Sequence, residues 1–271
     1  MKTRAIAICN MKGGVAKTTT TFSLAKYLAK NGKNVLCVDL DPQGNLTELT
    51  GLNKNDENFK NKTIAEIFKN IDNSNFDFKN LILKVDDISL VIANRNLQYE
   101  SESVMNKGMV DFTLEEHIEK LINENIYDYI LFDTPPSTST LTSNGIIASN
   151  EIIIPIQAEM LSLNGTADML DYLDELNNLM QKARREPKKI NGALITMVDL
   201  RTSLNRNIEQ TGRAELEKSG INVFKTIIHR NSKIGDSQTV NKSVFDYDNK
   251  SKGAIDYANF ALEIINQEKE I

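Results

Sequence analysis

The sequence predicts an α/β fold, in which a mostly parallel central sheet is flanked by helices. Short apolar runs alternate along the 271 residues with amphipathic stretches. Buried parallel strands are near-continuous apolar runs, and the crossover between two of them is usually a helix. The runs at 34–41 and 127–133 end in aspartate, which places carboxylates at the edge of the sheet where ligands bind in open α/β folds. The predicted strands are 4–9, 34–41, 88–93, 127–133, 151–156, 192–198 and 224–229.

The helices follow from apolar residues at helical spacing. A first helix covers about 19–30, with Phe22, Ala25 and Leu28 on one face, and Asn31-Gly32 marks its end. Further helices are expected at about 165–185 and 254–267.

Another helix is predicted to begin at a capping box. Thr113 and Glu116 have the spacing for reciprocal side-chain caps, and the apolar face that follows contains Leu114, Ile118, Leu121 and Ile122.

The chain is predicted to form a single domain over residues 1–271, with a variable helical insertion around 44–86. That region is rich in Asn, Lys and Asp and contains a short predicted helix at 63–68. No internal repeat or linker divides the sequence, and its length is sufficient to bury a full core.

The composition is that of an ordinary soluble protein, with 40% hydrophobic and 25% charged residues. Cys9 and Cys37 each lie in a predicted strand, which favours buried, reduced thiols over a disulfide or metal site. No apolar run reaches transmembrane length and the N-terminus lacks an apolar signal core, so we expect a cytoplasmic protein without a membrane partner. A formal net charge of −5 argues against coating of nucleic acid by bulk charge, but allows a local basic patch.

NMKGGVAKTTTT (10–21) follows a strand and opens a helix, which is the context of a phosphate-binding loop. Its glycines allow backbone N–H groups to turn toward an anion, and the helix adds its positive N-terminal end. Lys17 would reach the β- and γ-phosphates, the Thr18 hydroxyl would bind Mg²⁺, and Thr19 would donate to the α-phosphate. The residues predicted to bind nucleotide here are Gly13, Gly14, Val15, Ala16, Lys17, Thr18 and Thr19. A glycine-rich turn that binds nothing is disfavoured, because all these residue types fall at matching offsets.

The loop departs from G-x-x-x-x-G-K-[ST] in two places, with Met11 at the first glycine and Ala16 at the second. A methyl group at the second position is tolerated if φ is negative and strained otherwise. We expect nucleotide binding to persist there, with slower turnover.

The form K-G-G-x-x-K-T-T resembles the deviant Walker A loop of the ParA/MinD group of P-loop ATPases, of the SIMIBI type. The resemblance implies ATP and Mg²⁺ as cofactors and a homodimer that closes face to face over nucleotide. It also implies that Lys12 crosses to the partner's phosphates, where it would stabilise charge during hydrolysis as an arginine finger does. The competing interpretation of Lys12 is a solvated loop lysine.

Two aspartate motifs complete the predicted site. Asp39 and Asp41 lie in VDLDPQGN (38–45), a motif similar to the second signature of the same group. By that resemblance Asp41 positions the attacking water and Asp39 lies near the metal, whereas an isolated motif of this kind is commonly a turn with capping acids. Asp133 ends the strand in YILFDTPPS (129–137) and is predicted to hold Mg²⁺ in the Walker B manner.

The resemblance to the ParA partition family covers nearly the whole chain. The segments that carry it outside the motifs are 141–165, 195–206, 227–238 and 246–264. The segment IIHRNSKIGDSQ resembles the part of that family that contacts adenine, which assigns this role to His229 and Asn231, with His229 in place of the usual proline. A strand-end histidine without a ligand is the alternative.

The family resemblance implies the partners. The loop begins at residue 10, so we expect the short form without an extra N-terminal DNA-reading domain. Such proteins bind double-stranded DNA without sequence preference as ATP dimers on the nucleoid, and a ParB-type centromere-binding protein stimulates their ATPase. Salt-sensitive phosphate contacts would come from basic residues late in the chain. The candidates are Arg201, Arg206, Arg230, Lys233, Lys250 and Lys252. A denser basic run at 182–189 is a further candidate, and the competing interpretation is that its residues are solvated cations at a helix end.

Other functions of the same loop are less well supported. A MinD-like membrane ATPase needs a basic amphipathic C-terminal helix, whereas ALEIINQEKEI has three glutamates against one lysine. An iron–sulfur reductase needs exposed cluster cysteines, whereas Cys9 and Cys37 are both expected to be buried in strands. A tyrosine kinase of this group would need a tyrosine-rich tail, which is absent. A regulator in which nucleotide only sets conformation stays open, and turnover stimulated by a partner would count against it.

Overall fold

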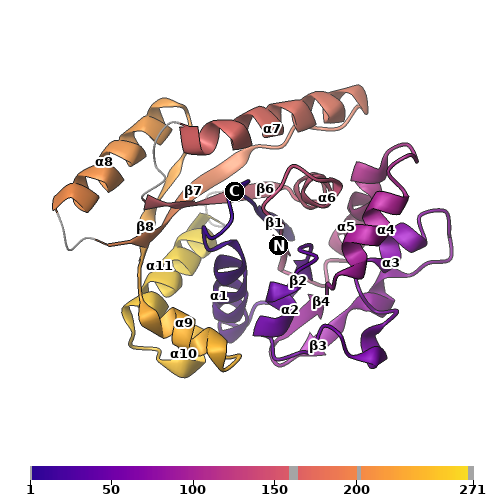
Figure 1. The fold of residues 1–271 in the computed structure, drawn as a ribbon, viewed down its shortest axis with the longest axis horizontal. Coiled ribbons are helices and arrows are strands. Elements are labelled where there is room, and N and C mark those ends of the chain that lie inside the picture. The colour runs from indigo at the N-terminus through magenta and orange to yellow at the C-terminus, as the bar shows by residue number, and fades with distance from the viewer. Residues whose placement is uncertain (1, 159–163, 200–202, 268–271) are drawn as a thin grey trace.

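Eight strands form one sheet in the computed structural model, which describes residues 2–158, 164–199 and 203–267, with the backbone alone at 164–166 and 203–208. The sheet order is β3-β4-β2-β5-β1-β6-β7-β8, and every neighbouring pair is parallel except β3 with β4 (Figure 1). The strands are β1 (Arg4–Ile8), β2 (Val35–Asp39), β3 (Leu83–Val85), β4 (Ile88–Val91), β5 (Tyr129–Asp133), β6 (Glu151–Gln157), β7 (Ile190–Val198) and β8 (Val223–His229). The prediction of a mostly parallel α/β sheet is therefore confirmed.

Helices cover both faces of this sheet (Figure 1). They are α1 (Lys17–Lys30), α2 (Asn45–Leu49), α3 (Glu66–Lys69), α4 (Asn96–Ser103), α5 (Thr113–Glu124), α6 (Thr140–Ala148), α7 (Asn164–Lys182), α8 (Ser203–Lys218), α9 (Ser232–Thr239), α10 (Val244–Tyr247) and α11 (Lys252–Gln267). Alternate strand residues face opposite ways, so Ile6 and Ile8 join one apolar core with α1 and α11, while Ala5 and Ala7 join another with α5, α6 and α7. This alternation therefore decides which strand side chains pack against α1.

The predicted capping box at Thr113 is wrong. Thr113 is the first residue of α5 and its hydroxyl donates to the Val110 carbonyl at 2.8 Å, because a 3₁₀ turn at Val110–Phe112 runs directly into the helix. The predicted apolar face is confirmed, since Leu114, Ile118 and Leu121 are buried and Ile122 is partly buried against the same core.

The region 44–86 contributes to the sheet as well as carrying short helices. Its last residues form β3, which pairs antiparallel with β4 at the edge. The helix predicted at 63–68 begins only at Glu66, because Thr63 forms a parallel bridge with Ile92.

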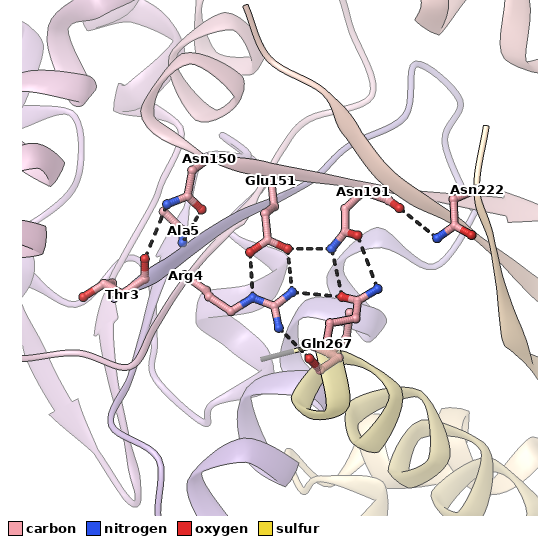
Figure 2. A network of polar contacts seen from close by, with 9 residues as sticks. Thr3, Arg4, Ala5, Asn150, Glu151, Asn191, Asn222 and Gln267 are labelled. Atoms are coloured by element: carbon pink, nitrogen blue, oxygen red, sulfur yellow. Dashed lines mark hydrogen bonds and ion pairs between the residues drawn. The ribbon is translucent and has the colours of Figure 1, made fainter. Parts of the chain in front are cut away.

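A polar network fastens α11 to the amino ends of β1, β6 and β7 (Figure 2). The Arg4 guanidinium donates from Nε to Glu151 Oε1 at 2.6 Å and from Nη2 to Gln267 Oε1 at 3.0 Å. It also donates to the Ile264 carbonyl, which lies in the last turn of α11, and Asn191 donates to both Glu151 and Gln267. The network lies at the opposite end of the strands from the predicted loop, so it supports the fold and leaves the site to other residues.

Gly145 lets α6 pack against the strand ends that carry the aspartates. A Cβ at Gly145 would lie 2.8 Å from Leu40 Cδ1 and 2.9 Å from Thr134 Cγ2. We expect Gly145→Ala to lower the free energy of unfolding by about 1–3 kcal/mol in urea denaturation, because an inserted methyl overpacks this contact. Gly235→Ala in α9 is the control: no atom lies within 4 Å of its Cβ position, so a gain of up to about 1 kcal/mol is expected. Equal effects of the two substitutions would contradict the packing argument.

Candidate functional site

The loop between β1 and α1 is held from two neighbouring strands. Asn10 Nδ2 donates to the Pro155 carbonyl at 2.8 Å, and Asn10 Oδ1 accepts from the Lys12 backbone N–H at 3.0 Å. The Thr196 hydroxyl donates to the Val15 carbonyl at 3.1 Å. The conformation of the loop is therefore fixed by β6 and β7 in addition to its own sequence.

An open cavity lies over the loop. Gly13 and Gly14 are exposed, Gly14 has a φ of 74°, and no atom lies within 4 Å of a Cβ built on either glycine. The cavity measures about 290 Å³. Its lining comprises Gly13, Gly14, Ala16, Lys17, Thr18, Thr19, Asp41, Asn45, Pro136 and Met197. The predicted loop residues other than the buried Val15 therefore surround one space together with Asp41, at the N-terminus of the long helix α1.

The two loop lysines are in different environments. Lys17 Nζ is buried and donates to the carbonyls of Asn10 at 3.0 Å and Lys12 at 2.9 Å. Burial lowers the pKa of Lys17, and the nearby Asp133 carboxylate opposes that shift. Lys12 is half-buried, and within the described part of the chain its ammonium group makes no hydrogen bond or ion pair. Lys17 belongs to the loop itself, whereas Lys12 is available to a group outside it.

Ala16 has a left-handed backbone, with φ 69° and ψ 30°. Ala16 therefore has the strained, positive-φ conformation, because a Cβ makes the left-handed region less favourable by about 1–2 kcal/mol.

The substitution Ala16→Gly should raise the free energy of unfolding by about 0.5–1 kcal/mol, because relief of the left-handed strain exceeds the entropy that glycine adds to the unfolded chain. Ala29→Gly, in the last turn of α1, is the control and should lower stability by up to about 1 kcal/mol. Thermal unfolding of both variants measures the difference, and a loss at both positions would contradict the strain.

Asp39 and Asp133 end adjacent parallel strands in register, so their carboxyl groups share the face of the sheet that α1 covers. Both side chains are completely buried. Neither carboxylate oxygen of Asp133 accepts a hydrogen bond of normal geometry. Burial and then the charge of Asp39 raise the pKa of Asp133 well above its usual value, and the nearby Thr18 hydroxyl and Lys17 only partly offset this.

These residues fit a magnesium ion. A buried carboxylate without partners is unfavourable unless a cation neutralises it, and hydroxyl and carboxylate oxygens are the ligands that Mg²⁺ prefers. The described residues contain no cluster of three or more His, Cys, Asp or Glu side chains that would enclose a metal by themselves. This agrees with the usual mode of Mg²⁺ binding, in which one or two protein ligands are joined by water and substrate phosphates.

Asp39 has a role that the sequence did not indicate. Its Oδ2 accepts from both the N–H and the hydroxyl of Thr47, at 2.9 and 2.7 Å, and its Oδ1 accepts from the Asp41 N–H at 3.1 Å. Burial raises the pKa of Asp39 to about 7, although these hydrogen bonds favour its ionised form. Asp39 therefore fixes the segment between β2 and α2.

Asp41 lies at the end of that segment. Its Oδ1 accepts from the Gln43 N–H at 2.9 Å, and Asp41 is one of the residues that line the loop cavity. This leaves Asp41 both oriented by the chain and accessible to a molecule in the cavity.

The two residues assigned to adenine line neither the loop cavity nor a second cavity at Thr18 and Thr19. Asn231 caps α9, because its side chain accepts from the Lys233 N–H at 2.8 Å. His229 Nδ1 lies 2.8 Å from Asp256 Oδ2, and its backbone N–H donates to the same oxygen at 3.0 Å. Both residues therefore have structural partners, and their adenine contacts stay a prediction.

The basic candidates differ in their surroundings. Arg201 lies outside the described residues, as does the side chain of Arg206. Arg230 and Lys250 are exposed, whereas Lys233 pairs with Asp236 at 3.4 Å and Lys252 with Asp256 at 3.1 Å. In the 182–189 run, Arg185 pairs with Glu115 at 3.4 Å and Lys188 donates to the Ser149 carbonyl at 2.6 Å. These contacts support a structural role for the denser run.

Met197 is a site residue that sequence reasoning missed. It lines the loop cavity with a φ of 56°, where the pairing of β7 with β8 shifts register. Strand periodicity cannot reveal such a position, because a bulge redirects the side chain.

The buried thiols are as predicted: Cys9 and Cys37 are free and fully buried. In the part of the chain that the structure describes, no helix is both long enough and apolar enough to span a bilayer.

Comparisons with known proteins find a matching family and near full-length relatives. A family described as AAA domain matches residues 3–185. The sporulation initiation inhibitor protein Soj of Bacillus subtilis is 34% identical over 262 residues, which cover 96% of this chain and 97% of that protein. The chromosome-partitioning ATPase Soj of Thermus thermophilus is 33% identical over 270 residues, which cover 99% and 98%.

A solved structure shows the same fold. Cobyrinic acid a,c-diamide synthase from Mycobacterium smegmatis, crystallised with an ATP analog and magnesium, superimposes with a TM-score of 0.81 at 29% identity, over 98% of this chain and 96% of that one. With near full-length relatives above 30% identity and the phosphate-loop geometry in place, this chain belongs to the Soj/ParA family of P-loop partition ATPases.

Proposed function

We propose that this chain is a DNA-segregation ATPase of a single domain, acting in the cytoplasm on the nucleoid. ATP and Mg²⁺ bind at the loop and close a homodimer, which binds double-stranded DNA without sequence preference. A ParB-type centromere-binding partner stimulates hydrolysis, and hydrolysis releases the DNA. The family membership and the chromosome-partitioning function of the Thermus relative support this proposal.

The cavity residues have different roles in the proposed phosphoryl transfer. Lys17 and the loop N–H groups bind the phosphates, Thr18 and Asp133 hold Mg²⁺, and Asp41 orients the attacking water. When bound, Mg²⁺ neutralises charge on the phosphate oxygens. The Lys12 ammonium of the partner copy stabilises the charge that develops in the transition state.

The observation that carries the proposal is the contrast between the two lysines of one loop. Lys17 is buried and bonded within the loop, whereas Lys12, five residues earlier, has no partner for its ammonium in the described structure. A second cation beside a phosphate site fits a mechanism in which a second copy completes the catalytic charge.

Retention on random-sequence DNA with MgATP, with MgADP and without nucleotide tests the function, at several salt concentrations. Binding that requires MgATP, weakens steeply with salt and disappears in Lys17→Ala supports a DNA-bound ATP dimer. Absence of binding in all three states contradicts the DNA role, and equal binding in all three contradicts nucleotide control. ATP turnover with and without DNA, measured in parallel, separates an ATPase from a regulator that nucleotide only switches.

A further inference from the structure

A side-chain hydrogen bond joins α9 to the phosphate loop. Gln238 Nε2 donates to the Thr19 hydroxyl oxygen at 2.9 Å. Both residues line a cavity of about 360 Å³ that also contains Thr18 and Asn45. Thr18, Thr19 and Asn45 line the loop cavity too, so the two cavities adjoin at Thr19.

The bond leaves the Thr19 proton available. A hydroxyl has one proton to donate and lone pairs to accept with, and Gln238 uses the oxygen as an acceptor. Helical threonines commonly donate to the carbonyl four residues earlier, as Thr21 does to Lys17 at 3.1 Å. For Thr19 the described residues provide Gln238 as the side-chain partner and no such carbonyl contact.

Packing brings Gln238 to this position. Thr20 of α1 and Tyr257 of α11 share a buried hydrogen bond of 3.2 Å. Helix α9 in turn lies so close to α11 that a Cβ at Gly253 would come within 2.6 Å of Ile234 Cγ1. The three helices are thus in contact, and Gln238 is presented to Thr19 by a packed interface.

We propose that Gln238 is a positioning residue for the nucleotide: it holds the Thr19 hydroxyl so that its proton is free for an oxygen of the α-phosphate. This inference rests on the proposed binding of ATP at the loop. It links α9 to nucleotide binding through Gln238, a residue that lies outside the phosphate-loop motif.

A double-mutant cycle on ATP and ADP binding tests the proposal. Gln238→Ala should weaken MgADP and MgATP binding roughly three- to tenfold, the value of one hydrogen bond, and raise KM with kcat nearly unchanged. Gln238→Glu should bind more weakly than Gln238→Ala, since a carboxylate accepts the Thr19 proton and repels phosphate. In a Thr19→Val background, Gln238→Ala should cause no further loss.

The control variant is Thr239→Ala, next to Gln238, whose hydroxyl bonds within α9 to the Asp236 carbonyl at 2.7 Å. It should retain native affinity, and unfolding of each variant without nucleotide checks that α9 is intact. A loss from Gln238→Ala that is equal in both Thr19 backgrounds, or no loss at all, overturns the positioning role. Failure of the native chain to bind nucleotide overturns the proposed function instead.

Discussion

Asp133→Asn is expected to stabilise the nucleotide-free protein and to abolish Mg²⁺-dependent ATP hydrolysis. The Asp133 carboxyl is fully buried, its oxygens accept no hydrogen bond of normal geometry, and Asp39 faces it across the register of β2 and β5. Asparagine has the same shape without the charge, and its amide can donate toward Asp39. A gain of about 1–3 kcal/mol in the free energy of unfolding at neutral pH is the size expected for removal of a buried unpaired group. The proposed binding of Mg²⁺ and nucleotide would offset the stability lost to Asp133.

The pH dependence of this gain has a definite sign. Burial raises the pKa of Asp133 in the folded protein above the unfolded value of about 4. The folded state therefore holds the proton more tightly, and this carboxyl opposes folding increasingly as the pH rises from about 4 through the folded pKa. The advantage of Asp133→Asn should be small near pH 4 and should grow toward neutral pH, and Asp39, whose pKa is raised to about 7, adds the same trend to both proteins.

Thermal unfolding of both proteins across this pH range, without nucleotide, measures the effect. Asp128→Asn is the matched control, because the Asp128 carboxylate lies just before β5 and accepts a hydrogen bond from the Asn34 N–H at 2.7 Å. That substitution should not stabilise the protein. Loss of stability in Asp133→Asn at neutral pH would contradict the cost assigned to the buried carboxylate. Full hydrolysis with Mg²⁺ would show that the Asp133 carboxylate is not the metal-binding group.

Hydrophobic pattern was sufficient for the sheet, with one exception. Continuous apolar runs predicted β1, β2 and β4 to β8, because strands covered on both faces must be apolar along their length. Strand β3 was missed because Leu83–Val85 is a short, incompletely buried edge strand, and three residues are too few to show a hydrophobic periodicity. The cap of α5 was misassigned because Thr113 has a local carbonyl partner, Val110, that the motif does not encode.

For the site, motifs predicted the residues but not their relations. Because the motifs follow predicted parallel strands, Lys17, Asp41 and Asp133 were expected at one edge of the sheet, and they lie around one end of it. The anchoring of Asp39 by Thr47 and the contact of Gln238 with Thr19 depend on segments that only tertiary packing brings together. No periodicity or motif spacing in a single sequence indicates such contacts.

Lys12→Ala is expected to retain nucleotide binding while losing hydrolysis by on the order of a thousandfold, the scale of an arginine finger. The contact that Lys12 makes with Lys17 comes from its backbone carbonyl, which alanine keeps. Lys12 is half-buried as a residue and its ammonium makes no bond in the described part of the chain, so the loop should survive removal of this side chain. Titration with MgADP and steady-state turnover give the two results separately, and near-native turnover would leave Lys12 as a solvated loop lysine.

Mixing two inactive variants decides whether Lys12 acts on its own nucleotide or on that of a second copy. The other variant is Asp41→Asn, which keeps an oxygen to accept from the Gln43 N–H. If Lys12 acts across a dimer, a mixed dimer has one complete site: the Lys12→Ala copy supplies Asp41 and the Asp41→Asn copy supplies the lysine. An equal mixture should then recover about a quarter of native activity, since half of the dimers are mixed and each has one working site of two. If Lys12 acts within its own copy, every site in the mixture lacks either the lysine or the aspartate, and activity stays at the level of the separate variants.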